Sequence, residues 1–104
     1  MITASFVKSN GKFCSFRIHG HSGYAESGSD IVCAAVSAMA MLTVNNITEE
    51  FGIPAKIVAD EEGPVIDFKL QNEDERACAL IAGLWRELSA LANDYPKNIR
   101  VTVK

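Results

Sequence analysis

The sequence predicts one α+β domain over residues 1–104, a two-layer sandwich in which two helices cover one face of a mostly antiparallel sheet. Three observations predict it. Apolar residues alternate with period two in five short segments, apolar residues follow helical spacing in two longer ones, and turn-forming residues separate the seven. The expected order is therefore strand, strand, helix, strand, strand, helix, strand. An apolar fraction of 48% supports one ordinary core.

The first two strands are expected over residues 2–7 and 13–19, and the turn Ser9-Asn10-Gly11 joins them as a hairpin. Alternation along the second strand divides its side chains between the two faces of the sheet. The inward set is Cys14, Phe16 and Ile18, and the outward set is Phe13, Ser15, Arg17 and His19.

A first helix is expected from Ile31 to about Phe51, with Ser29 or Asp30 as its N-cap and Gly52 and Pro54 beyond its end. Residues 55–60 and 65–70 follow as a second hairpin. A second helix opens with Asn72 as cap and Glu75 three residues later, as in a capping box, and Pro96 marks its exit. Residues 99–103 form the last strand.

Charge and cysteine content exclude several classes of protein. The net charge is −3 and the lysines and arginines form no cluster along the chain, so we expect no direct binding to nucleic acid. Neither a basic start before an apolar run nor eighteen consecutive apolar residues occurs, which predicts a cytoplasmic protein without a membrane partner. Three cysteines are an odd number without framework spacing, so we expect free thiols.

Cys33 is the candidate nucleophile, because it falls in the first turn of the first predicted helix. Unpaired backbone N–H groups and the positive end of the helix dipole favour thiolate over thiol there. The same N–H groups are candidates for an oxyanion hole. Cys14 and Cys78 lack this setting and are interpreted as packing residues.

His21 is the candidate general base, because a loop of eleven residues leaves enough chain to bring its imidazole back to Cys33. Gly20, Gly23 and Gly28 give that loop its hinges, and we expect it to be mobile without substrate. At 100° per residue, Asp30 and Ser37 share the helix face of Cys33. Asp30 is expected to cap the helix, and a catalytic use of its carboxylate would be to orient His21. Ser37 could position substrate or His21, or bond back to the helix.

Two other readings remain open at this point. His19 and His21, with Cys33 and Asp30, would complete a four-ligand zinc set, although a single H-x-H is a nonspecific signal. The chain could also be a small dimeric interaction module without enzymatic activity. Both alternatives predict no peptide cleavage, and only the first predicts bound zinc.

The run F-R-I-H-G-H-S-G-Y-A-E-S-G-S-D-I-V-C-A-A-V-S-A resembles the signature of the ribosomal-processing cysteine protease family Prp, also called YsxB-like. The length and element order agree over essentially the whole chain. The resemblance implies a homodimeric cytoplasmic endopeptidase that needs no cofactor. Its implied substrate is the N-terminal extension of large-subunit ribosomal protein twenty-seven, which ends in a hydrophobic and aromatic stretch.

By motif position, the catalytic histidine of that family falls on His21 and its nucleophile on Cys33. Asp30 and Ser37 occupy the other motif positions. Ser22 stands where many members carry alanine, a small difference that leaves the assignment in place.

Overall fold

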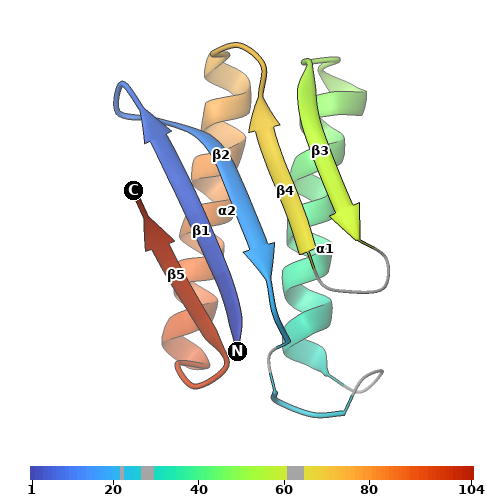
Figure 1. The fold of residues 1–104 in the computed structure, drawn as a ribbon, viewed down its shortest axis with the longest axis vertical. Helices are drawn as coiled ribbons and strands as arrows, with labels where there is room; N and C mark the ends of the chain where they lie inside the picture. The colour runs from blue at the N-terminus through green and yellow to red at the C-terminus, as the bar shows by residue number, and fades with distance from the viewer. Residues whose placement is uncertain (22, 27–29, 61–64) are drawn as a thin grey trace.

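The computed structural model describes residues 1–21, 23–26, 30–60 and 65–104. Its elements follow the predicted order (Figure 1). They are β1 (Ile2–Ser9), β2 (Lys12–His19), α1 (Ile31–Asn45), η1 (Asn46–Glu50), β3 (Ala55–Asp60), β4 (Val65–Leu70), α2 (Glu75–Asp94) and β5 (Ile99–Val103). The single turn of π-helix, η1, continues α1, so the first predicted helix is present over its full length.

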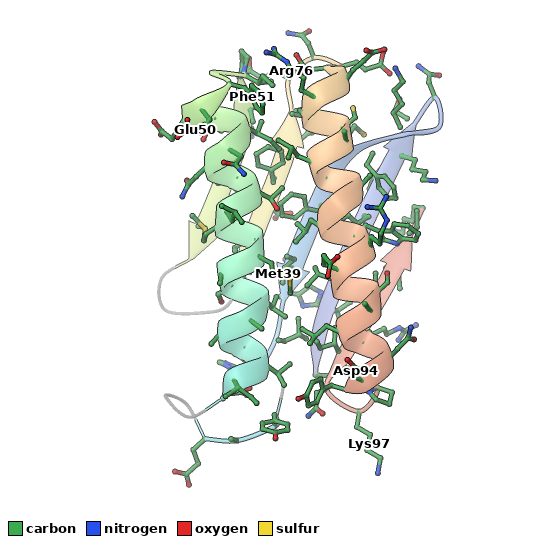
Figure 2. All side chains as sticks on the ribbon, turned by 180° about the vertical axis from the view of Figure 1, so that it is seen from behind. Met39, Glu50, Phe51, Arg76, Asp94 and Lys97 are labelled. Carbon is green, nitrogen blue, oxygen red and sulfur yellow. The ribbon has the colours of Figure 1, made fainter. Side chains whose placement is uncertain are left out.

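The strands form one five-stranded sheet in the order β3-β4-β2-β1-β5. The pairs β1/β2, β2/β4 and β3/β4 are antiparallel, and only β1/β5 is parallel. Both long helices pack on the same face of this sheet, as the front and back views show (Figures 1 and 2). The predicted two-layer α+β fold is therefore confirmed, and no helix of the described residues lies on the opposite face of the sheet.

Aromatic rings fill the space between the sheet and the helices. The rings of Phe16 and Phe68 stack with centroids 5.1 Å apart, and Phe6 lies 5.8 Å from Phe16. Phe13 contacts Trp85 of α2 at 5.4 Å. Because Phe6, Phe16 and Phe68 are almost fully buried, this cluster fixes α2 against the central strands.

The predicted facing of the second strand is wrong at its beginning. The β1/β2 register shifts between Val7 and Lys8, which pair with Ser15 and Phe13 respectively, so Cys14 is the extra residue of a β-bulge. The bulge reverses the alternation locally and turns Phe13 into the core, where it is 7% exposed. Cys14 is only partly buried, and its thiol donates to the carbonyl oxygen of Val7 at 3.4 Å.

The predicted cap of the second helix is also wrong. The N-cap is Asp74, whose carboxylate accepts from the backbone N–H groups of Arg76 and Ala77, at 2.9 and 3.1 Å. Asn72 lies two residues before it. An aspartate next to the first helical residue satisfies two helix-end donors, which a side chain three residues upstream of Glu75 cannot reach.

The helical segment Ile31–Glu50 is long and apolar enough, by length and composition alone, to cross a membrane. The expectation drawn from the sequence counted only uninterrupted apolar runs and did not register it. In this structure one side of the segment belongs to the core, through Val32, Val36, Ala40, Val44 and Ile47. Only 28% of its most apolar window is buried, so much apolar surface faces outward.

Candidate active site

Asp30 holds the start of α1 and thereby positions Cys33. Its backbone is extended, and its Oδ1 accepts hydrogen bonds from the N–H groups of Val32 and Cys33, each at 3.0 Å. The Asp30 carbonyl oxygen accepts from Ala34 N–H at 3.1 Å. The prediction of Asp30 as cap is confirmed, and Cys33 is the third residue of the helix.

The helix start is consequently satisfied by groups of the chain itself. The N–H groups of Val32, Cys33 and Ala34 all donate to Asp30. An oxyanion stabilised by the Cys33 N–H would have to replace the Asp30 carboxylate as acceptor. The oxyanion hole at the helix start therefore stays a prediction.

The Cys33 side chain is partly buried and packs against the edge of the core. Its neighbour Val32 is directed into the core, and Ala34 on its other side is exposed. Ser37, one turn further along α1, is also exposed. The helix therefore presents the thiol at the boundary between core and solvent, on the side that carries Ser37.

His21 lies two residues beyond the end of β2, and its side chain is exposed. Gly20 before it has φ +97°, and a Cβ at this position would overlap the carbonyl oxygen of Met1. A glycine is thus required where the chain leaves the sheet. The end of β2 and the start of α1 lie at the same end of the molecule (Figure 1).

An aromatic contact anchors the described part of the loop between His21 and Asp30. The ring of Tyr24 meets the ring of Tyr95, which follows α2, edge to face at 5.4 Å. The sequence did not signal this contact, because the two tyrosines are far apart in the chain and belong to no shared motif. Gly23 is described with φ +71°, whereas Ser22, Gly28 and Ser29 lie outside the described residues.

The other two cysteines do not share the setting of Cys33 at a helix start. Cys78 on α2 is 6% exposed and belongs to the core, as predicted. Cys14 lies at the bulge of β2 and is not part of the buried core. Cys14, Cys33 and Cys78 form no disulfide in the structure.

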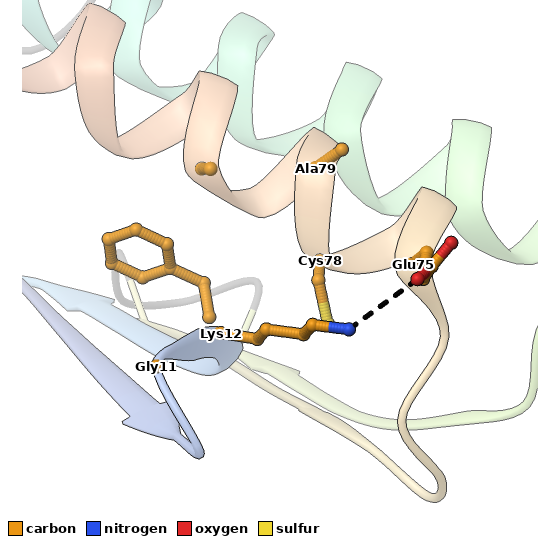
Figure 3. A pocket seen from close by; sticks show the side chains of 7 residues that line it. Gly11, Lys12, Glu75, Cys78 and Ala79 are labelled. Carbon is orange, nitrogen blue, oxygen red and sulfur yellow. Dashed lines mark ion pairs between the residues drawn. The ribbon is translucent and has the colours of Figure 1, made fainter.

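A shallow pocket of about 350 Å³ opens between the β1–β2 hairpin and α2 (Figure 3). Cys78 lies at its floor, and the ion pair between Lys12 and Glu75, at 3.7 Å, borders it. The pocket adjoins the first residues of β2, whereas His21 follows the last one. With a rise of about 3.3 Å per residue, the two places are roughly 25 Å apart. This pocket is therefore separate from the predicted site.

The residues of the zinc alternative are all described, and they do not assemble. Within the described residues, no group of three or more His, Cys, Asp or Glu side chains is close enough to hold a metal ion. His19 points outward from β2, as its strand position predicted, and is exposed. The geometry therefore gives no support to the four-ligand set.

Comparison with known proteins agrees with the resemblance seen in the motif. The family model of cysteine protease Prp matches residues 1–100. The ribosomal processing cysteine protease Prp of Bacillus subtilis is 32% identical, over 98% of this chain and 96% of its own length.

Two crystal structures of the essential ribosomal processing protease Prp from S. aureus match this chain over its full length and over their own full length. The one with a covalently linked product peptide has a TM-score of 0.94 at 27% identity. The one with a substrate peptide has a TM-score of 0.88 at 26% identity. Because the family model spans nearly the whole chain, this protein belongs to the cysteine protease Prp family.

Proposed function

We propose that this protein is a cysteine endopeptidase that removes the N-terminal extension of large-subunit ribosomal protein twenty-seven. One observation carries the proposal. Cys33 lies in the first turn of the capped helix α1, at the boundary between core and solvent. The end of β2, which His21 follows after Gly20, lies at the same end of the molecule (Figure 1). Its relatives supply the reaction class, since they are named ribosomal processing proteases and one is crystallised with a covalently linked product.

The proposed reaction begins with transfer of the Cys33 thiol proton to His21. The sulfur then attacks the scissile carbonyl carbon, whose π electrons move to oxygen, and a tetrahedral oxyanion forms. Collapse of this intermediate expels the amine, which takes the proton from His21, and leaves a thioester on Cys33. Water, deprotonated by His21, hydrolyses the thioester and regenerates the thiol.

Asp30 and Ser37 have supporting roles in this proposal. Asp30 fixes the position of Cys33 through the two cap hydrogen bonds at 3.0 Å. Ser37 lies one turn along the same exposed side of α1, where a hydroxyl can contact a bound peptide or His21. Residues Gly20 and Gly23 supply the backbone conformations of the loop that brings His21 to the helix start.

A peptide spanning the cleavage junction of the ribosomal protein tests the proposed function. We expect the wild-type protein to cut it at one bond, and Cys33→Ala and His21→Ala to leave it intact while keeping the native circular dichroism spectrum. Cys14→Ala is the matched control and keeps activity. Cleavage by a folded Cys33→Ala variant would refute the proposal.

The proposal includes a cytoplasmic homodimer, and the outward side of α1 supports the second copy. Ile31, Met41 and Leu42 are 58%, 41% and 63% exposed there, and α1 carries no charged residue. Exposed apolar side chains of this kind mark interaction surfaces. Light scattering at micromolar concentration is expected to give twice the monomer mass for the wild type. The Leu42→Glu variant is expected to give the monomer mass. A wild-type monomer would contradict the dimer.

A further inference from the structure

The uncovered face of the sheet collects basic residues from four strands. Arg17 on β2 lies between Phe16 and Ile18, which are both buried, so its side chain points away from the helices. Lys69 on β4 lies between buried Phe68 and Leu70 in the same way. The register extends the set, because Lys56 pairs with Lys69 and Arg100 pairs with Thr3, itself the partner of His19.

We call Arg17, Lys56, Lys69 and Arg100 the basic sheet face. They are four of the ten lysines and arginines in the chain, and all are exposed. Among the side chains described on this face, Asp67 is the acidic one, and it forms an ion pair with Arg17 at 3.8 Å. Lys56, Lys69 and Arg100 form no ion pair within the part of the chain that the structure describes.

The helical layer has the opposite charge. α1 carries no charged residue, and η1 and α2 together carry five exposed acidic residues against two arginines. The acidic set is Glu49, Glu50, Glu75, Glu87 and Asp94. Among the described residues, the uncovered sheet face is therefore mainly positive and the helical layer mainly negative, although the net charge of the chain is −3. The sequence could not show this, because positions 17, 56, 69 and 100 are adjacent only in the sheet.

One pair on this face is unfavourable for the fold itself. Lys56 and Lys69 are direct cross-strand partners in the β3/β4 ladder. Like charges placed directly opposite each other on a sheet destabilise the pairing. An anionic ligand bound over the two lysines would offset this repulsion, because it would attract both ammonium groups.

The remaining side chains of the face indicate which anion fits. Four hydroxyl residues stand between the cations: Thr3, Ser5, Ser15 and Thr102, of which Thr102 donates to Ser5 at 3.2 Å. Lysine, arginine, serine and threonine are the side chains that contact phosphate and sugar in nucleic-acid complexes. Among the side chains described on the face, His19 is the one aromatic ring available for base stacking.

An acidic protein partner fits this face less well. Protein interfaces are built around buried aromatic or aliphatic anchors. Val7, Val58 and Val65 are the apolar side chains described on the uncovered side, and no two of them are direct cross-strand partners. The cations instead spread from β5 to β3 over four strand intervals of about 4.8 Å, roughly 19 Å. Such a spread matches a repeating chain of phosphates.

We propose that the basic sheet face binds the phosphate backbone of RNA without sequence preference. The four cations would each replace a condensed counterion, and the hydroxyls would donate to phosphate or ribose oxygens. The protease site at the start of α1 is not part of this surface. Binding to RNA and cleavage of a short peptide are therefore independent properties, and either can fail without the other.

Fluorescence anisotropy with a labelled twelve-nucleotide oligouridine tests the proposal. We expect a Kd of about 10⁻⁵ M near physiological salt, and a slope of log K against log salt of roughly −2 to −3 for up to four contacts. The double variant Lys56→Gln/Lys69→Gln should reduce that slope by about 1.4. Its peptide cleavage and thermal midpoint should match or exceed those of the wild type, because an unfavourable pair is removed.

The matched control is Arg86→Gln/Lys97→Gln, which makes the same change in charge on exposed residues outside the basic sheet face. It should leave the slope unchanged. A DNA oligonucleotide that binds as tightly as RNA would still support backbone recognition. Absence of RNA binding at low salt, equal loss in the control variant, or equal competition by polyglutamate would overturn the proposal.

Discussion

The carboxylate of Asp30 accepts a hydrogen bond from the backbone N–H of Cys33 at 3.0 Å, in the first turn of α1. The same oxygen accepts from Val32 N–H. The Asp30 side chain therefore caps the start of the helix and positions the thiol. It also accepts the hydrogen bond of the backbone N–H that an oxyanion would use. In the proposed mechanism Asp30 would affect both stability and catalysis, and variants can separate the two effects.

Asp30→Ala is expected to lower the free energy of unfolding by about 1 kcal/mol, because two helix-end donors lose their acceptor. Asp30→Asn keeps an oxygen acceptor and should retain most of this stability. Urea titration measures both. If Asp30 acts only as a cap, the cleavage rate of Asp30→Asn stays close to that of the wild type. If the charge of Asp30 acts on His21, the cleavage rate falls while the free energy of unfolding is unchanged.

Asp74 is the matched control for this prediction, because it caps α2 with the same carboxylate geometry. Asp74→Ala should also lower the free energy of unfolding, but kcat and KM should be unchanged. Equal losses of activity in the two alanine variants would mean that the effect of Asp30 on cleavage is purely one of stability.

Gly20→Ala is expected to destabilise the protein by about 1 to 3 kcal/mol, because it adds a Cβ against the Met1 carbonyl oxygen at a positive φ. It should also reduce cleavage, since the displaced backbone carries His21. Gly23→Ala is the control: φ is positive there too, but no atom of the described residues lies within 4 Å of the added Cβ. Its cost should be about 1 kcal/mol. Equal thermal shifts in the two variants would contradict the contact with Met1.

Tyr95→Ala should loosen the loop through loss of the edge-to-face contact with Tyr24. Such ring pairs contribute about 0.5–1.5 kcal/mol, which corresponds to a roughly 2- to 12-fold faster hydrogen exchange of amides 23–26. Tyr95→Phe keeps the ring and should exchange at the wild-type rate. Unchanged exchange in Tyr95→Ala would show that the contact does not restrain the loop.

Asp74 makes the free energy of unfolding depend on pH in the acid range. Its pKa is lowered from its ordinary value, first because the Arg76 side chain donates to the carboxylate and then because Ala77 N–H does. The unfolded chain therefore binds this proton first as the pH falls. The contribution is complete above the unfolded pKa, about 3.9, and disappears as the pH falls through the folded value.

Urea titrations of wild type and Asp74→Asn from about pH 6 to pH 3 measure this dependence. The wild type should lose its advantage over the variant toward the acid end. Arg76→Gln removes the largest cause of the shift and should show a weaker dependence. A constant difference between wild type and Asp74→Asn across the range would be inconsistent with the lowered pKa.

The sequence alone was sufficient for the fold, because periodicity and turn residues determine the type and order of elements. It failed where one residue changes a pattern, as at the Cys14 bulge, which turned Phe13 inward, and at the cap Asp74. Cys33 and Asp30 could be placed from helix-capping chemistry. The contact of Tyr24 with Tyr95 could not be predicted, because it depends on packing between distant segments.

Cleavage of the junction peptide by two complementary cysteine variants tests the central claim most directly. The variant that keeps only Cys33, with Cys14→Ala and Cys78→Ala, should cut the peptide and lose activity after alkylation of its one thiol. The variant that keeps only Cys14 and Cys78, with Cys33→Ala, should be folded and inactive. Activity in the second variant, or full activity in the first after complete alkylation, would contradict the account.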